Sequence, residues 1–123
     1  EALPSYAAGI QDVTIAACSD EEGGGMGCQR TCLFQEGPPV TEEVVFIEKP
    51  YTLAMRGVGE NPYQITKDLT LITLADVGDG KTEVLFRMYF DHPEPSTMAA
   101  ATEAGFREMG DGLVRRFGGR VHP

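Results

Sequence analysis

Basic residues are scarce in this sequence, and their scarcity argues against one class of partner. Ten Lys and Arg residues stand against nineteen Asp and Glu residues, which gives a net charge of −9. A surface with this balance repels phosphate backbones and anionic lipid headgroups, so we expect no nucleic-acid partner. Long apolar stretches are also missing. None approaches the roughly 20 residues that a membrane-spanning helix needs, and no integral membrane segment is predicted.

Cysteine and histidine are few as well. The chain has Cys18, Cys28 and Cys32, together with His92 and His122. Any disulfide scheme leaves one cysteine unpaired, which favours a reducing compartment and predicts a cytoplasmic protein. Neither histidine has a companion at the spacing of a metal site or of a nucleophile, and no G-x-S-x-G motif occurs. The sequence therefore predicts no metal, no cofactor and no local catalytic triad.

Short apolar runs, separated by Gly, Pro, Asn and Asp, make up most of what is present. The 123 residues are 41% hydrophobic and 24% charged, a composition typical of one ordinary globular domain. No repeat or linker divides the chain, so residues 1–123 are predicted to form a single domain. The runs predict an antiparallel meander, with strands over residues 12–18, 28–35, 41–49, 51–58, 65–75 and 82–90.

A long amphipathic helix is predicted at the C-terminal end. Ser96 can cap it, and Gly118 and Gly119 can stop it, so the expected helix runs over residues 97–117. Apolar residues and one threonine recur at spacings of three and four, which places them on one face of the helix. These residues are Met98, Thr102, Phe106, Met109, Leu113 and Phe117.

The stretch "EEGGGMGCQR", residues 21–30, resembles a phosphate-binding loop only in its glycine content. A dinucleotide loop needs its glycines between a strand and a helix, and a Walker loop needs a Lys followed by Ser or Thr. Here the glycines lie between two predicted strands, and nearby acidic residues would repel phosphate. The stretch is interpreted as a hairpin turn.

Several segments in a fixed order resemble the START-like, or helix-grip, superfamily. They are "GGGMGCQRTCLF", "TEEVVFIEKPYTLAMRGV" and "GDGKTEVLFRMYFDH", preceded by "LPSYAAGI" and followed by the helix. The bacterial polyketide cyclase/dehydrase and lipid-transport group is the most similar branch. The resemblance implies an α+β fold in which a curved antiparallel sheet wraps around a long C-terminal helix. It also implies that the domain is N-terminally incomplete, because the family's first strand and helix have no counterpart here.

An apolar pocket between sheet and helix is what the resemblance and the alternation of residues predict. Each of its apolar residues, taken singly, can also belong to the hydrophobic core rather than line a pocket. Two polar residues are candidates for orienting a ligand: Arg30, which would select an anionic group, and Tyr63, at the pocket mouth. For Arg30 an exposed position paired with an acid from a neighbouring strand is the favoured alternative. The predicted ligand-binding residues are Arg30, Met55, Tyr63, Phe86, Met88, Phe106, Met109 and Leu113.

Three functions remain open on these observations. The favoured one is binding or transport of a hydrophobic small molecule, such as a lipid, polyketide or aromatic metabolite, for which the chain's five methionines offer adaptable packing. The second is an enzyme of the polyketide cyclase/dehydratase kind. The third is an accessory interaction domain that docks a partner on its outer sheet face, and a homodimer is one possible partner state. Residues 35–40 and 57–64 are expected to form loops at the pocket mouth.

Overall fold

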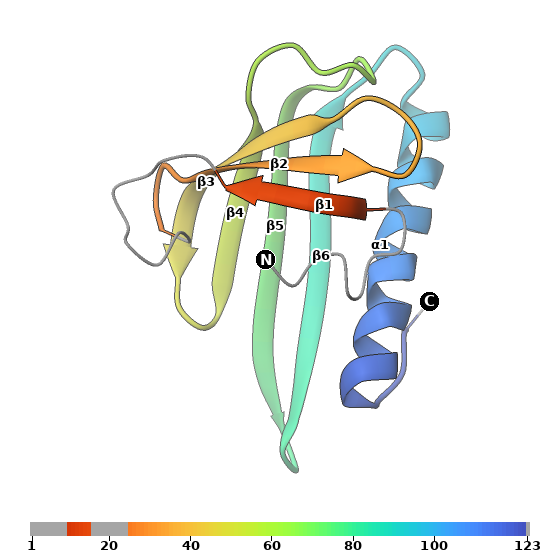
Figure 1. Ribbon diagram of the computed structural model, residues 1–123. Coiled ribbons are helices and arrows are strands. Elements are labelled where there is room, and N and C mark those ends of the chain that lie inside the picture. The colour runs from red at the N-terminus through yellow and green to blue at the C-terminus, as the bar shows by residue number, and fades with distance from the viewer. Residues whose placement is uncertain (1–9, 16–24, 123) are drawn as a thin grey trace.

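The computed structural model describes residues 10–15 and 25–122, and Figure 1 shows their arrangement. They form six strands followed by one helix. The strands are β1 (Ile10–Ile15), β2 (Gln29–Phe34), β3 (Val40–Glu48), β4 (Thr52–Gly57), β5 (Thr66–Gly78) and β6 (Lys81–Asp91), and the helix is α1 (Pro95–Phe117). Each predicted strand is present, with small differences at its ends.

All six strands belong to one sheet in the order β1-β2-β3-β4-β5-β6, with antiparallel neighbours throughout. This is the predicted meander, and the predicted α+β, helix-grip fold class is confirmed. The β5–β6 hairpin turns where the sequence predicts it. Asp79 and Gly80 both have positive φ, at 56° and 69°, as a two-residue hairpin turn of the favoured twist requires.

The sheet is strongly curled, so that β1 and β2 cross in front of β5 and β6 in Figure 1. Its concave face can be defined by cross-strand partners, because directly opposite residues point to the same side of a sheet. One row on this face joins Val44, Met55, Thr70 and Met88. Met55 is only 1% exposed and packs in a cluster with Cys28 and Val44. The core therefore lies inside the curl.

The helix α1 begins at Pro95, with Glu94 as the N-cap residue, so the prediction that Ser96 caps it is wrong. Proline suits the first helical position because its missing N–H needs no partner there and its φ is already helical. The predicted end is confirmed, since Gly118 closes the helix with a φ of 83° and donates its N–H to the carbonyl of Val114.

Most of the predicted apolar face of α1 turns toward the sheet. Its members are half-buried except Phe117, which lies at the last residue of α1 and is 74% exposed. Phe106 stacks on Phe86 of β6, and Met109 packs against Cys32 of β2. The helix thus contacts both β2 and β6, which lie four positions apart in the strand order of the curled sheet.

The glycine-rich stretch joins β1 to β2, which pair antiparallel, so its strand-to-strand setting is confirmed. Residues 16–24 of this connection, and residues 1–9 with most of "LPSYAAGI", lie outside the described residues. Gly27 has a φ of 78° and donates its N–H to the carbonyl of Val44.

Cys28 is disulfide-bonded, so the cysteine count no longer supports a reducing, cytoplasmic location.

Candidate functional site

The predicted apolar residues of the strands share the concave face. Met55 and Met88 both oppose Thr70, and in the next row Phe86 opposes Ile72. The ring of Phe86 stacks on that of Phe106, with centroids 5.4 Å apart and planes inclined by 25°. Phe86 and Met88 are half-buried rather than buried. An apolar surface beneath α1 is therefore only partly covered.

Two further predicted residues lie on the helix side of the same space. Met109 contacts the cluster around Cys32, which also includes Val13 and Phe34. Leu113 is half-buried one turn further along α1. Together with Phe106, these side chains form the apolar face that α1 turns toward the sheet.

Arg30 also lies on the concave face, where it opposes Glu42 across β2 and β3. Its Nη2 is 3.6 Å from Glu42 Oε1, and the two side chains are only 17% and 18% exposed. The Nε–H of Arg30 is buried and has no hydrogen-bond partner among the described residues. The pairing with an acid from a neighbouring strand is thus present, but the arginine is not the exposed residue that this alternative assumed.

Glu42 has an unusual environment for a carboxyl group. Burial raises its pKa, the charge of Arg30 opposes that rise, and the nearby charge of Asp68 adds to it, with a net increase. Asp68 is fixed by a 2.9 Å hydrogen bond that its Oδ2 accepts from the Gly57 N–H. Gly57 is the β4 partner of Glu42, and a side chain there would collide with Asp68. Arg30, Glu42 and Asp68 form what we call the polar triad.

Tyr63 holds loops together at the end of the sheet where β4 ends and β5 begins. Its hydroxyl donates to the carbonyl of Pro38 at 3.0 Å, and its ring meets Phe34 edge to face at 6.4 Å. Its carbonyl lies 2.9 Å from His92 Nε2, while His92 Nδ1 accepts the N–H of Glu94. Tyr63, which lies in the β4–β5 loop, is therefore bonded to both the β2–β3 loop and the β6–α1 loop. Its hydroxyl already has a hydrogen-bond partner in the Pro38 carbonyl.

These three connections surround a cleft of about 750 Å³. Both predicted mouth loops line it, through residues such as Pro39 and Val58. Its lining also includes Gly57 and Asp68, which adjoin Glu42. The cleft thus reaches from the loop end of the sheet to the polar triad.

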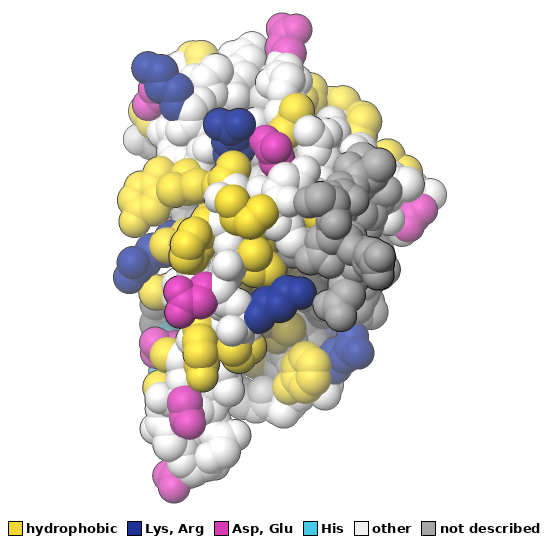
Figure 2. Space-filling model, turned by 90° about the vertical axis from the view of Figure 1, so that its left-hand side faces the viewer, with side chains coloured by type: hydrophobic (Ala, Val, Ile, Leu, Met, Phe, Trp, Pro, Cys, Tyr) yellow, Lys and Arg dark blue, Asp and Glu magenta, His cyan; other side chains and the backbone are white. Residues whose placement is uncertain are grey.

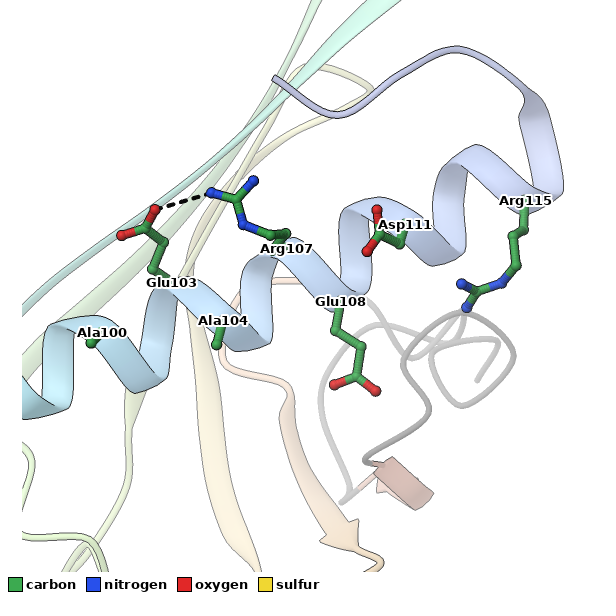
Figure 3. A pocket seen from close by; sticks show the side chains of 7 residues that line it. All are labelled: Ala100, Glu103, Ala104, Arg107, Glu108, Asp111 and Arg115. Carbon is green, nitrogen blue, oxygen red and sulfur yellow. Dashed lines mark hydrogen bonds and ion pairs between the residues drawn. The ribbon is translucent and has the colours of Figure 1, made fainter. Parts of the chain in front are cut away.

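A second hollow, of about 480 Å³, lies on α1 (Figure 3). Its lining residues all come from the helix, and Glu103 and Arg107 among them form an ion pair at 3.2 Å. Phe106, Met109 and Leu113 are not among them. This hollow is the polar side of α1 and is separate from the predicted pocket.

The outer face of the sheet carries exposed apolar side chains between charged ones. In this set, Phe46 is 47% exposed and Tyr89 is 56% exposed. Figure 2 shows apolar side chains on one side of the molecule in a band that charged side chains interrupt. Arg87 and Tyr89 are exposed, as their alternation with Phe86 and Met88 predicts.

Sequence reasoning selected Arg30 but missed Glu42 and Asp68. A signal for Glu42 was available, because Glu42 and Glu43 are consecutive in β3 and successive strand residues point to opposite faces. One of the two carboxylates therefore had to face inward. Asp68 gave no such signal, since its place depends on an irregularity in the β5–β6 pairing between Thr66 and Leu69.

Residues 10–15 and 25–122 contain no group of three or more His, Cys, Asp or Glu that could hold a metal ion. The helix found in these ranges lacks the apolar character that crossing a membrane requires.

Comparisons with known proteins bear on the fold. No family model matches the chain, and no curated protein matches it significantly. The crystal structure of an uncharacterized protein from Bacillus thuringiensis aligns with a TM-score of 0.61 and 16% identity, over 87% of this chain and 77% of that one. A point mutant of norcoclaurine synthase from Thalictrum flavum, in complex with a transition-state analogue, aligns with a TM-score of 0.64 and 16% identity, over 93% and 75%. These likenesses show a shared helix-grip fold.

Proposed function

We propose that residues 1–123 act as one domain that binds a hydrophobic small molecule on the concave face of the sheet, beneath α1. The observation that carries the proposal is the row of apolar side chains left half-buried there. Phe86 and Met88 of the sheet and Phe106 of the helix belong to it. Ligand sites are usually concave and mostly apolar, with a few polar groups that fix orientation. The polar triad supplies such groups next to Met55.

The adaptable chemistry of the site supports a ligand of variable shape. Met55 and Met88 come from the sheet and Met109 from the helix, and unbranched thioether side chains adjust to irregular surfaces. The cleft at the loop end offers an entrance, with the mouth loops at its rim. The norcoclaurine synthase structure supports the proposal only by analogy, because that protein holds a small molecule in a similar fold.

A fluorescence titration with N-phenyl-1-naphthylamine, a neutral dye that brightens in apolar surroundings, tests this proposal. Phe86→Ala removes a ring from the concave face, whereas Tyr89→Ala removes one from the outer face of the same strand. We expect Phe86→Ala to weaken dye binding about fivefold or more, because the ring's contact area is lost, and Tyr89→Ala to leave it within twofold. Absence of dye binding to the unaltered protein, or equal effects of both variants, would contradict the proposal.

A cyclase/dehydratase activity is a second candidate, and Glu42 is the observation that favours it. A partly buried carboxyl with a raised pKa beside an arginine is suited to proton transfer. Glu42→Gln keeps the shape of the side chain but cannot transfer a proton. Loss of turnover of a reactive polyketone in this variant, with dye affinity retained, is the expected result of an enzymatic role. Equal turnover would remove Glu42 from it.

A further inference from the structure

We infer that the ligand carries an anionic oxygen on its apolar body, and that this oxygen binds Arg30 in place of the Glu42 carboxylate. The inference rests on the proposed function and adds a chemical class to it: carboxylates, sulfonates or phenolates on an apolar frame. Under this inference, Glu42 is a counter-ion that becomes neutral when the ligand enters.

Arg30 has unused hydrogen-bonding capacity. A guanidinium group has five N–H donors in a planar fork that suits paired oxygens. The contact from Arg30 Nη2 to Glu42 Oε1 is long, at 3.6 Å, and the Nε–H is buried without a partner among the described residues. Buried donors are normally satisfied, so an unpaired one on a concave apolar face points to a missing acceptor.

The charge of Glu42 depends on its burial and on the groups that face it. The charged groups that act on its carboxyl within the described part of the chain are Arg30 from β2 and Asp68 from β5. On β4 the facing residue is Gly57, which has no side chain, and Glu43 of β3 points to the other face. Burial and Asp68 both favour the protonated carboxyl. An anion at Arg30 adds a further reason for Glu42 to take up a proton, so binding and protonation are coupled.

The polar triad can be reached from the loop end of the sheet, because Asp68 lines the cleft there. The cleft at the loop end is lined by Gly57 and Asp68, which adjoin Glu42 in the sheet. Met55 lies two positions before Gly57 in β4, on the same face. A ligand entering from this cleft can therefore place its polar end at Arg30 and its apolar body along Met55 and Phe86.

Two dyes of matched shape test the inference. 1-Anilinonaphthalene-8-sulfonate is N-phenyl-1-naphthylamine with an added sulfonate, which stays ionised between pH 5 and pH 8. Both are titrated against the unaltered protein, Arg30→Lys, Glu42→Gln and the control Arg56→Lys, with far-UV circular dichroism to verify folding. Arg56 pairs with Glu43 on the outer face and is the matched exposed arginine.

We expect Arg30→Lys to weaken binding of the sulfonate dye about tenfold, because the planar fork of the guanidinium is lost. The same variant should change binding of the neutral dye less than twofold. The control Arg56→Lys should change binding of the sulfonate dye less than twofold. For the unaltered protein, sulfonate affinity should rise about threefold or more from pH 8 to pH 5, because binding takes up a proton. Glu42→Gln should bind the sulfonate more tightly and lose this pH dependence. It supplies the test if Arg30→Lys does not fold.

The outcomes separate the two claims. If the neutral dye binds, but sulfonate binding is unchanged in Arg30→Lys or keeps its pH dependence in Glu42→Gln, the inference is overturned and the proposed function stands. If neither dye binds the unaltered protein, both are overturned.

Discussion

Two arginine–glutamate pairs stand side by side in the sheet on opposite faces, and they differ in every respect that matters. Arg30–Glu42 faces inward at 3.6 Å, with side chains 17% and 18% exposed. Arg56–Glu43 faces outward at 3.3 Å, with side chains 61% and 25% exposed. The shorter contact belongs to the more exposed pair. Because water solvates exposed charges, the net contribution of such a pair to the free energy of unfolding is only about 0–1 kcal/mol. Burial, not distance, is therefore what sets the inward pair apart from the outward one.

The largest expected difference between the pairs comes from removing each glutamate. Glu42→Ala leaves the guanidinium of Arg30 buried without a counter-charge, which should lower the free energy of unfolding by about 3 kcal/mol. Glu43→Ala leaves an exposed arginine that water can solvate, and should cost less than about 1 kcal/mol. Urea denaturation of both variants measures the difference. Equal losses would show that the two faces offer these charges the same environment.

The next effect is a rescue. Replacing both members of a buried ion pair by apolar residues of similar size is often neutral or stabilising, because desolvation of two charges is avoided. We expect Arg30→Met combined with Glu42→Leu to recover most of the roughly 3 kcal/mol lost in Glu42→Ala. The same double variant should lose its preference for the sulfonate dye. Recovery of stability together with retained preference would place anion selectivity elsewhere.

A smaller effect is expected at the mouth. Tyr63→Phe removes the hydrogen bond to the Pro38 carbonyl, which should cost about 1 kcal/mol. In Tyr63→Phe, hydrogen exchange should become faster in residues 35–40 and 57–64, because the two loops lose the hydrogen bond that joins them. In the unaltered protein, saturation with neutral dye should make hydrogen exchange slower in both loops. Exchange that responds to neither change would show that these loops do not gate the site.

The smallest effect is a pH dependence of stability. The raised pKa of Glu42 means that the folded state binds more protons than the unfolded state above the ordinary pKa of 4.5. The stabilising contribution of this group is therefore complete below that value and is lost as pH rises through the raised pKa. Relative to Glu42→Gln, the unaltered protein should become less stable from pH 4.5 to pH 8. A constant difference between the two proteins would contradict this assignment.

The periodicity of the sequence was enough to predict the strands and the apolar residues that face the space beneath α1. Alternation with a period of two places Phe86 and Met88 inward and Arg87 and Tyr89 outward, and this holds because both faces of β6 follow a regular pleat. Helical spacing likewise identified Phe106 and Met109. Local rules failed at the helix ends, where Pro95 rather than Ser96 sets the start and Phe117 lies beyond the sheet's cover.

The polar part of the site was less predictable because it depends on cross-strand partners. Arg30 lies opposite Glu42 on the neighbouring strand. Burial is the main cause of the raised pKa of Glu42, and the charge of Asp68, which is 26 positions further along the chain, adds to it. The bond from Tyr63 to Pro38 joins residues 25 positions apart. No local pattern encodes such contacts, whereas the register of the sheet determines them.

The methionine methyl groups provide the most direct test of the proposed concave-face site. In a two-dimensional carbon–proton spectrum of methyl-labelled protein, saturating neutral dye should shift the signals of Met55, Met88 and Met109, because aromatic rings displace the resonances of methyl groups beside them. Met26 is 53% exposed and outside the proposed site, and its signal should stay in place. Shifts of these three signals, with that of Met26 unmoved, are the predicted result. A shift of Met26 with the other three unmoved would contradict the account.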